Sequence, residues 1–271
     1  MELSRSKLKQ ICYEYNVTIR DGLLLLQNIL GTDYTTLFFN RVIFLSNLQY
    51  LKFIEYIERL SNNEPLSKII GYKYFYNNKF YTNRFTLDPR PETEVIVELF
   101  IKYFLNKNEG LKILDLGCGT GCIGLSILLL YNNATLHLLD ISQDALEVAE
   151  LNAKSLQVMD RCKLIKSNWF DEVNDTYDVI VSNPPYVSTN YKLDKAVLYD
   201  PKEALFAGID GMDSYNKILP VAHLYLKNNG KLFIEIGYNQ SDKIKEINTE
   251  LKRIEIAKDL NNIDRVVVYN T

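Results

Sequence analysis

The apolar residues of the first sixty positions recur at the spacing of a helix, with charged side chains between them. The positions that show this period are Leu23, Leu26, Ile29, Leu30, Leu51, Ile54 and Ile57. A repeat of about three to four residues places apolar side chains on one face of a helix, where they can form a core. We therefore predict a small helical domain over residues 1–66.

Residues 69–87 lose this period and become rich in aromatic residues on both sides of the pair Asn77-Asn78. Aromatic runs that flank a turn pair predict a β-hairpin, and we expect it to form a linker over residues 67–88. Pro91 then suits the first position of a helix, and Glu92 and Glu94 suit its positive first turn. A helix is predicted over residues 91–105.

From residue 111 onward, short apolar runs typical of strands alternate with segments of helical spacing. Strands are predicted at residues 111–116, 135–139, 162–166, 177–182, 231–236, 253–256 and 264–269, and helices at 121–131, 142–155 and 213–226. Strands separated by helices form right-handed crossovers and a mostly parallel sheet with helices on both faces. The sequence thus predicts an α/β domain with a seven-stranded sheet over residues 89–271.

The composition is that of an ordinary globular protein, with 47% hydrophobic and 24% charged residues in a chain of 271. These values exclude intrinsic disorder as the main state. No apolar run approaches the roughly 18 residues that a membrane span requires. The opening residues carry charges of both signs, which argues against a secretory signal. We therefore expect a cytoplasmic protein that does not bind a membrane.

The charge distribution argues against nucleic-acid binding, and the cysteine content argues against a disulfide framework or a metal site. Residues 1–85 carry a net charge of +4 and the remainder −7, far from the dense basic patch that binding to a phosphate backbone usually requires. The four cysteines are too scattered for a disulfide framework. Neither His137 nor His223 lies at a ligand spacing from Cys118 and Cys122. We expect reduced thiols and no metal site.

A glycine-rich segment at the end of a predicted strand is the first motif that indicates a ligand. Gly117-Cys-Gly-Thr-Gly121 opens into a predicted helix, so a ligand can approach main-chain N–H groups without a Cβ in the way. Asp140 ends the next predicted strand, where a carboxylate can accept hydrogen bonds from both ribose hydroxyls. The segment and Asp140 together predict a nucleotide-like ligand.

Two alternatives stay open for this segment. Gly119, Gly121 and Gly124 also fit the dinucleotide fingerprint G-x-G-x-x-G, which would suit a nicotinamide-dependent dehydrogenase. A tight strand-to-helix turn without a ligand would have a similar sequence. Asp115, which precedes Gly117 by two positions, completes the order D-x-G-x-G-x-G, and this order resembles that of S-adenosylmethionine-dependent methyltransferases.

A second motif, Asn183-Pro184-Pro185-Tyr186, follows the predicted strand 177–182 and so lies at the carboxyl edge of the sheet, where α/β proteins bind ligands. Each proline fixes φ and removes an N–H. The Asn183 side-chain oxygen and the Pro184 carbonyl can then accept hydrogen bonds from one NH₂ group, while Tyr186 offers a flat face for stacking. A simple turn would also explain Asn beside Pro. The four residues together favour a site that selects a planar nitrogen nucleophile.

Such a nitrogen is a weak nucleophile because its lone pair is delocalised. Acceptors that pull on both N–H groups bind more strongly as positive charge develops on the nitrogen, and this stabilises the transition state. The cationic product then loses a proton without a strong base, which agrees with the absence of His or a carboxylate from the motif. Asn183, Pro184 and Tyr186 are the predicted catalytic residues.

Further short motifs follow one another from about residue 59 to the C-terminus. They are Glu64-Pro65, Ile70-Gly71, Pro89-Arg-Pro-Glu-Thr-Glu94, Asn168-Trp-Phe170, Glu203-Ala-Leu-Phe-Ala-Gly208, Asp210-Gly211 and Glu235-Ile-Gly237. With the glycine segment and Asn-Pro-Pro-Tyr, this order resembles the HemK-type peptide chain release factor glutamine methyltransferases. The run from Pro89 to Glu94 discriminates best, because Asn-Pro-Pro-Tyr is shared with adenine and other glutamine methyltransferases.

The resemblance implies a Rossmann-like class I methyltransferase domain. It would transfer a methyl group from S-adenosyl-L-methionine to the side-chain amide of the glutamine in the Gly-Gly-Gln loop of class I release factors, in translation termination. The family's cofactor contacts would fall on Gly117, Cys118, Gly119, Thr120, Gly121, Asp140, Trp169 and Asn183, with the ribose at Asp140 and the adenine at Trp169. Its substrate contacts would fall on Asn183, Pro184, Pro185 and Tyr186. The N-terminal domain would grip the release factor, and the enzyme would act as a monomer.

Other functions stay open. A glutamine methyltransferase that acts on a ribosomal protein would have the same motif with a different N-terminal domain. An adenine-N6 methyltransferase on DNA or RNA would suit the motif equally well, but the acidic catalytic part and the lack of a basic stripe count against a direct nucleic-acid substrate. A dehydrogenase leaves Asn-Pro-Pro-Tyr unexplained. An inactive binding protein is disfavoured because neither motif is damaged, and Trp169 alone would more simply be a core or rim aromatic residue.

Overall fold

The computed structural model describes the whole chain, residues 1–271, which divides into two compact units. The N-terminal unit comprises Met1–Gly71 and Leu193–Tyr199, and the sheet unit comprises Tyr72–Lys192 and Asp200–Thr271. Each unit has a hydrophobic core of its own. None of the helices is both long and apolar enough to span a membrane.

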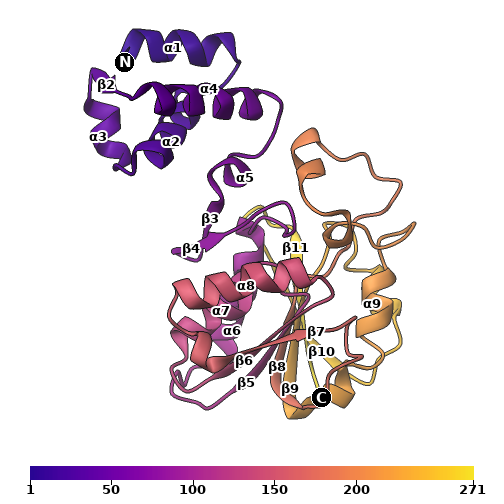
Figure 1. Cartoon of the computed structure of the whole chain (residues 1–271). Coiled ribbons are helices and arrows are strands. Elements are labelled where there is room, and N and C mark those ends of the chain that lie inside the picture. Colours follow the sequence, from indigo (N-terminus) through magenta and orange to yellow (C-terminus); the bar gives the residue numbers. More distant parts are fainter. The chain divides into compact units, whose positions relative to one another are not determined.

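The N-terminal unit is mainly helical, as the sequence predicted (Figure 1). Its helices are α1 (Arg5–Glu14), α2 (Ile19–Leu30), α3 (Tyr34–Phe39), α4 (Asn47–Ser61) and α5 (Leu66–Ile70). The first four helices begin at side-chain caps, in which Ser4, Thr18, Asp33 and Ser46 each accept a hydrogen bond from a first-turn N–H. Such caps satisfy donors that the helix leaves unpaired, so the sequence fixes where these helices start.

The N-terminal unit also contains two short strands that were not predicted from the sequence. β1 (Glu2–Ser4) pairs antiparallel with β2 (Val42–Phe44). Leu3 and Ile43 lie opposite each other in this pair, and both are buried in the core of the unit. Three residues are too few to show the two-residue period of a strand, so the pairing emerges only when the helices bring the two segments together.

The sheet unit starts with the predicted hairpin, formed by β3 (Tyr72–Phe75) and β4 (Asn78–Tyr81). Its turn residues are Tyr76 and Asn77, which both have positive φ, whereas the predicted turn was Asn77-Asn78. The observed register buries Phe75 and Phe80, with ring centroids 6.1 Å apart. A shift by one residue would turn one of these rings to the opposite face, so core packing selects the turn.

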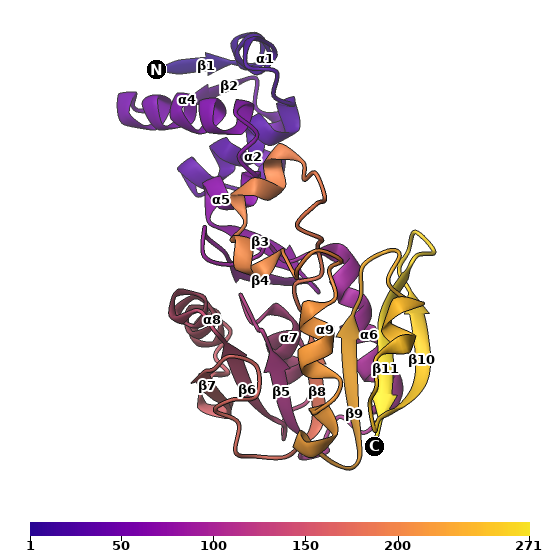
Figure 2. The ribbon, with the colours of Figure 1, turned by 90° about the vertical axis from the view of Figure 1, so that its right-hand side faces the viewer.

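The predicted seven-stranded, mostly parallel sheet is confirmed, in the order β10-β11-β9-β8-β5-β6-β7 (Figure 2). Among strands β5 to β9, every neighbouring pair is parallel, whereas β11 is antiparallel to both β9 and β10. The bounds are β5 (Lys112–Leu116), β6 (Thr135–Asp140), β7 (Cys162–Lys166), β8 (Tyr177–Ser182), β9 (Leu226–Glu235), β10 (Lys252–Lys258) and β11 (Asp264–Asn270).

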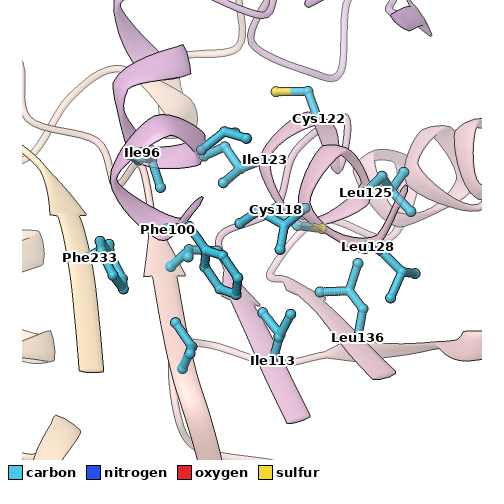
Figure 3. Close-up of a cluster of buried hydrophobic side chains, with 14 of the residues drawn as sticks. Ile96, Phe100, Ile113, Cys118, Cys122, Ile123, Leu125, Leu128, Leu136 and Phe233 are labelled. Carbon is cyan, nitrogen blue, oxygen red and sulfur yellow. The ribbon is translucent and has the colours of Figure 1, made fainter. Parts of the chain in front are cut away.

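Helices cover both faces of the sheet because successive strand residues point to opposite sides. α6 (Glu94–Tyr103), α7 (Cys122–Leu130) and α8 (Gln143–Ser155) pack on one face, in a core that includes Ile113. Figure 3 shows Phe100 of α6 in this core, and its ring centroid lies 6.0 Å from that of Phe233 on β9. The other face, which includes Leu114, is covered by α9 (Asp213–Ile218).

The predicted helix 213–226 is wrong in its second half. α9 ends at Ile218, a 3₁₀ turn follows at Ala222–Tyr225, and β9 already begins at Leu226. Pro220 explains the early end, because proline lacks an N–H and its ring clashes with the preceding helical turn. The predicted helix 91–105 likewise divides into a 3₁₀ turn, Pro91–Thr93, and α6. This turn places Thr93 at the start of α6.

Candidate active site

The glycine loop connects the end of β5 to α7 and depends on left-handed backbone conformations. Gly117, Gly119 and Gly121 have φ of 75°, 54° and 75°, which glycine adopts without the steric cost that other residues meet. The N–H groups of Gly117 and Cys118 each donate to Leu139 O at 2.8 Å. These bonds attach the loop to the end of β6, where Asp140 lies.

Asp140 joins the loop to the next crossover through both carboxylate oxygens. Oδ2 accepts from Gly119 N and Oδ1 from Ser142 N, each at 2.9 Å. Burial raises the pKa of Asp140, and these two N–H donors oppose the rise. A carboxylate has about four acceptor positions, so each oxygen keeps a lone pair for a hydroxyl group of a ligand.

A cavity of about 670 Å³ adjoins the loop and Asp140, a size that suits a ligand of nucleoside dimensions. The predicted site residues that line it are Gly117, Cys118, Gly119, Thr120, Asp140, Trp169, Asn183 and Pro185. Gly121, Pro184 and Tyr186 are not among its lining residues. The cavity lies at the carboxyl ends of the strands, which is the expected location for a ligand in an α/β sheet.

Trp169 forms part of the cavity wall beside the glycine loop. A Cβ added at Gly117 would lie 3.9 Å from Cζ3 of the indole, so the ring lies close to the loop backbone. Trp169 has a φ of 52°, and its carbonyl accepts from Ser167 Oγ at 2.9 Å. The segment after β7 therefore holds a partly exposed aromatic face at the cavity, where a planar base can stack.

Asn183 follows β8 and is oriented by a residue from a distant part of the chain. Its Nδ2 donates to Thr93 Oγ1 at 3.1 Å. Because the amide nitrogen is engaged in this way, Oδ1 is the atom that remains for a ligand in the cavity. Ser182, the preceding residue, donates from Oγ to Leu116 O at 2.7 Å and ties the end of β8 to β5.

Tyr186 supports the motif from the side of β9. Its hydroxyl donates to Glu235 Oε1 at 3.1 Å, and its main-chain oxygen accepts from Gln240 Nε2 at 3.0 Å. Burial raises the pKa of Tyr186, so the hydroxyl keeps its proton and remains a donor. The ring as a stacking surface for the substrate stays a prediction.

Sequence reasoning assigned no role to Thr93, Glu235 or Gln240, although these residues contact the motif. Thr93 and Glu235 lie within two of the short motifs noted above, but a motif does not say which atoms meet. The available signal was an acid at the end of the apolar run Leu232-Phe-Ile-Glu235. Glu235 is 1% exposed, and burial raises its pKa to about 7.

Asp115 supports the glycine loop from inside the sheet unit. Its Oδ2 accepts from Gly124 N at 2.9 Å, and Oδ1 is buried without a hydrogen bond. Burial, together with the neighbouring Asp140, raises the pKa of Asp115 to about 7, although the Gly124 N–H donor opposes the rise. The acid in the D-x-G order therefore contacts the first turn of α7 and is not among the residues that line the cavity.

Comparisons with known proteins identify the family. A family model described as "Methyltransferase small domain" matches residues 93–208, and one described as "PrmC N-terminal domain" matches residues 5–71. The release factor glutamine methyltransferase of Francisella tularensis is 38% identical over 253 residues, which cover 92% of this chain and 89% of that protein. The chain belongs to the release factor glutamine methyltransferase family. The family expected from the motifs is thus confirmed, and it is a family of S-adenosylmethionine-dependent methyltransferases.

One further relative and one solved structure are also similar to this chain. The bifunctional methyltransferase of Rickettsia bellii is 35% identical over 275 residues, and the match covers 90% of this chain but only 50% of that protein. This chain therefore spans about half the length of that relative. The solved 16S rRNA methyltransferase of Thermus thermophilus, in complex with AdoMet and guanosine, superposes with a TM-score of 0.51 at 14% identity, over 74% of this chain and 49% of that one. That likeness shows the fold alone.

Proposed function

We propose that this protein transfers a methyl group from S-adenosyl-L-methionine to the side-chain amide nitrogen of the glutamine in the Gly-Gly-Gln loop of class I peptide chain release factors. The observation that carries the proposal is the Asn183 amide. Its nitrogen is held by Thr93 at 3.1 Å, so its oxygen can accept from a substrate N–H beside the cavity.

The residues present fit S-adenosylmethionine. Gly117 to Gly121 would hold the methionine part, because the loop presents backbone without side chains at its glycines. Asp140 would accept from the ribose hydroxyls with the lone pairs that its two backbone bonds leave, and Trp169 would stack on the adenine. Asn183 would contact both cofactor and glutamine. When bound, the cofactor supplies a methyl carbon that is electrophilic because it is attached to a sulfonium.

The chain's own contribution is to hold and activate the amide nitrogen. Asn183 Oδ1 and the Pro184 carbonyl would accept hydrogen bonds from the two N–H groups of the glutamine side chain. Both bonds strengthen as positive charge develops on the nitrogen, which lowers the barrier. Pro185 forms part of the wall, and Tyr186 holds the motif in place through Glu235. Orientation of the nitrogen toward the methyl group would supply much of the remaining acceleration.

The proposed partner is a protein, without a direct nucleic-acid substrate. The match of residues 5–71 to the PrmC N-terminal domain supports a role for the N-terminal unit in binding the release factor. We infer that the enzyme acts as a monomer in the cytoplasm, where translation termination takes place.

A direct test is methyl transfer from labelled S-adenosylmethionine to an intact release factor, a ribosomal protein, and adenine-containing DNA or RNA. We expect label only in the release factor, with mass analysis placing it on the glutamine of the Gly-Gly-Gln peptide. Asn183→Ala should lower turnover by about 10²-fold, as expected for loss of one preorganised polar contact. Asp140→Ala should mainly weaken cofactor binding. Label in the ribosomal protein or nucleic acid alone would refute the proposal.

A further inference from the structure

We propose that Thr93 is a positioning residue that sets the orientation of the Asn183 side-chain amide, so that Asn183 Oδ1 rather than Nδ2 faces the substrate nitrogen. The inference rests on the proposed function and deepens it, because it names the residue on which the catalytic acceptor depends.

The orientation of an asparagine amide is decided by its partners, because its oxygen and nitrogen ends have nearly the same shape. A half-turn of the Asn183 amide would present an N–H group to the substrate N–H, and two donors cannot bond to each other. Thr93 is 2% exposed and lies in the 3₁₀ turn before α6, 90 positions away from Asn183 in sequence. Its Oγ1 is the only hydrogen-bond partner that the structure gives to Asn183 Nδ2, at 3.1 Å.

A threonine hydroxyl can donate as well as accept, so a further group must turn the Thr93 hydroxyl away from Asn183. Glu235 is placed to do this. Its Oε1 accepts from Tyr186, while its Oε2 is buried without a hydrogen bond. The Thr93 hydroxyl is also one of the groups that lower the pKa of Glu235. In its ionised form Glu235 only accepts, so a Thr93 hydroxyl turned toward it would keep its lone pairs for Asn183 Nδ2.

The backbone of the motif is held by contacts that do not involve Thr93. Gln240 is 4% exposed; it donates to Tyr186 O at 3.0 Å and its oxygen accepts from Gly237 N at 2.8 Å. Ser182 is tied to β5 on the other side of Asn183. The contacts of the backbone therefore leave the Asn183 side-chain amide free to rotate, and the hydrogen bond to Thr93 prevents this rotation.

The test compares Thr93→Val, which removes the hydroxyl at nearly constant shape, with Thr93→Ser, which retains it. In assays of methyl transfer to an intact release factor, Thr93→Val should lower kcat about 10- to 100-fold, with little change in KM or in the dissociation constant of S-adenosylmethionine. Thr93→Ser should keep most of the activity. In the Asn183→Ala background, Thr93→Val should have no further effect, because the two residues act as one unit.

A measurement independent of activity is the ¹⁵N signal of the Asn183 side-chain amide, assigned by its loss in Asn183→Ala. The signal should shift in Thr93→Val and stay close to its wild-type position in Thr93→Ser. If Thr93→Val does not fold, Thr93→Ala removes the same acceptor and takes its place.

The inference is overturned if Thr93→Val leaves the amide signal unchanged, or if it lowers kcat by the same factor with and without Asn183. A wild-type enzyme that fails to methylate release factors would instead refute the proposed function. In that case the amide signal still decides whether Thr93 orients Asn183.

Discussion

Two acids that end or lie near the end of central strands are completely buried. Asp115 on β5 is 0% exposed and Glu235 on β9 is 1% exposed, and burial raises the pKa of each to about 7. An ionised carboxylate is costly away from water unless hydrogen bonds compensate it. Each of the two has one oxygen that lacks a hydrogen bond. Burial of these two acids therefore lowers the stability of the protein at the strand ends that carry the glycine loop and support Asn-Pro-Pro-Tyr.

Glu235 makes stability depend on pH in a defined direction. Its pKa is about 7 in the folded protein against an ordinary value of 4.5 for glutamate, so the folded state retains a proton that the unfolded chain releases between these values. The protonated Glu235 side chain contributes up to about 3 kcal/mol of stability below pH 4.5, and this contribution is lost as the pH rises through about 7. We expect Glu235→Gln, which does not titrate, to gain stability relative to wild type from about pH 5 to pH 8.

Urea unfolding of both proteins at these pH values measures the effect. Asp115 titrates in wild type and variant alike, so its contribution cancels in the difference. A difference in unfolding free energy that stays constant across the range would show that Glu235 is already ionised in the folded protein at low pH.

At the scale of elements, α7 is the helix that links the glycine loop to the core. Residues 122–128 are all buried, and Gly121, the residue that precedes the helix, provides no side-chain cap. Its first turn is instead held by the bond from Gly124 N to Asp115 Oδ2. The close approach of this turn to β5 and β6 is possible because residue 124 has no Cβ.

Gly124→Ala should destabilise the protein, although alanine is the better helix former by about 1 kcal/mol. The added Cβ would lie 2.8 Å from Leu136 Cδ1 and 2.9 Å from Asp115 Oδ2, and such overpacking typically costs about 1–3 kcal/mol. Gly110→Ala is the matched control, because its Cβ would meet nothing nearer than Asn133 O at 3.8 Å. Chemical unfolding measures both variants, and equal stabilities would contradict the predicted clash.

At the scale of the molecule, the N-terminal unit is built from two separate stretches of chain. The segment Leu193–Tyr199 belongs to it, although this segment follows Asn-Pro-Pro-Tyr in sequence. Within the unit, Tyr199 donates from its hydroxyl to Asn62 O at 3.3 Å. A fragment that ends at residue 71 would therefore lack part of its own unit.

Because the proposed cofactor residues all lie in the sheet unit, S-adenosylmethionine should protect that unit preferentially. At 100 times its dissociation constant it should add about 2.7 kcal/mol to the free energy of opening. Hydrogen exchange measures this, with amides of β5 and β6 slowed and those of α2, in the core of the N-terminal unit, unchanged. Equal slowing in α2 would show that the two units open together.

Local signals in the sequence determined the strands and helices of the sheet unit, the glycine loop, Asn-Pro-Pro-Tyr and the family. Periodicity, the need for positive φ at Gly117 and the order of short motifs are all properties of neighbouring residues, so they can be read without a structure. Pro220 was also visible, and its helix-ending effect accounts for the early end of α9.

Only the tertiary structure decided which atoms meet at the site. The partners of Asn183 and Tyr186 are Thr93 and Glu235, which are 90 and 49 positions away. Their contacts arise because α6 and β9 pack beside the end of β8, and no local pattern encodes the direction of a hydrogen bond between such distant segments. The sequence thus determined the motif, while the packing of the sheet unit determined which of its groups face the cavity and which support it.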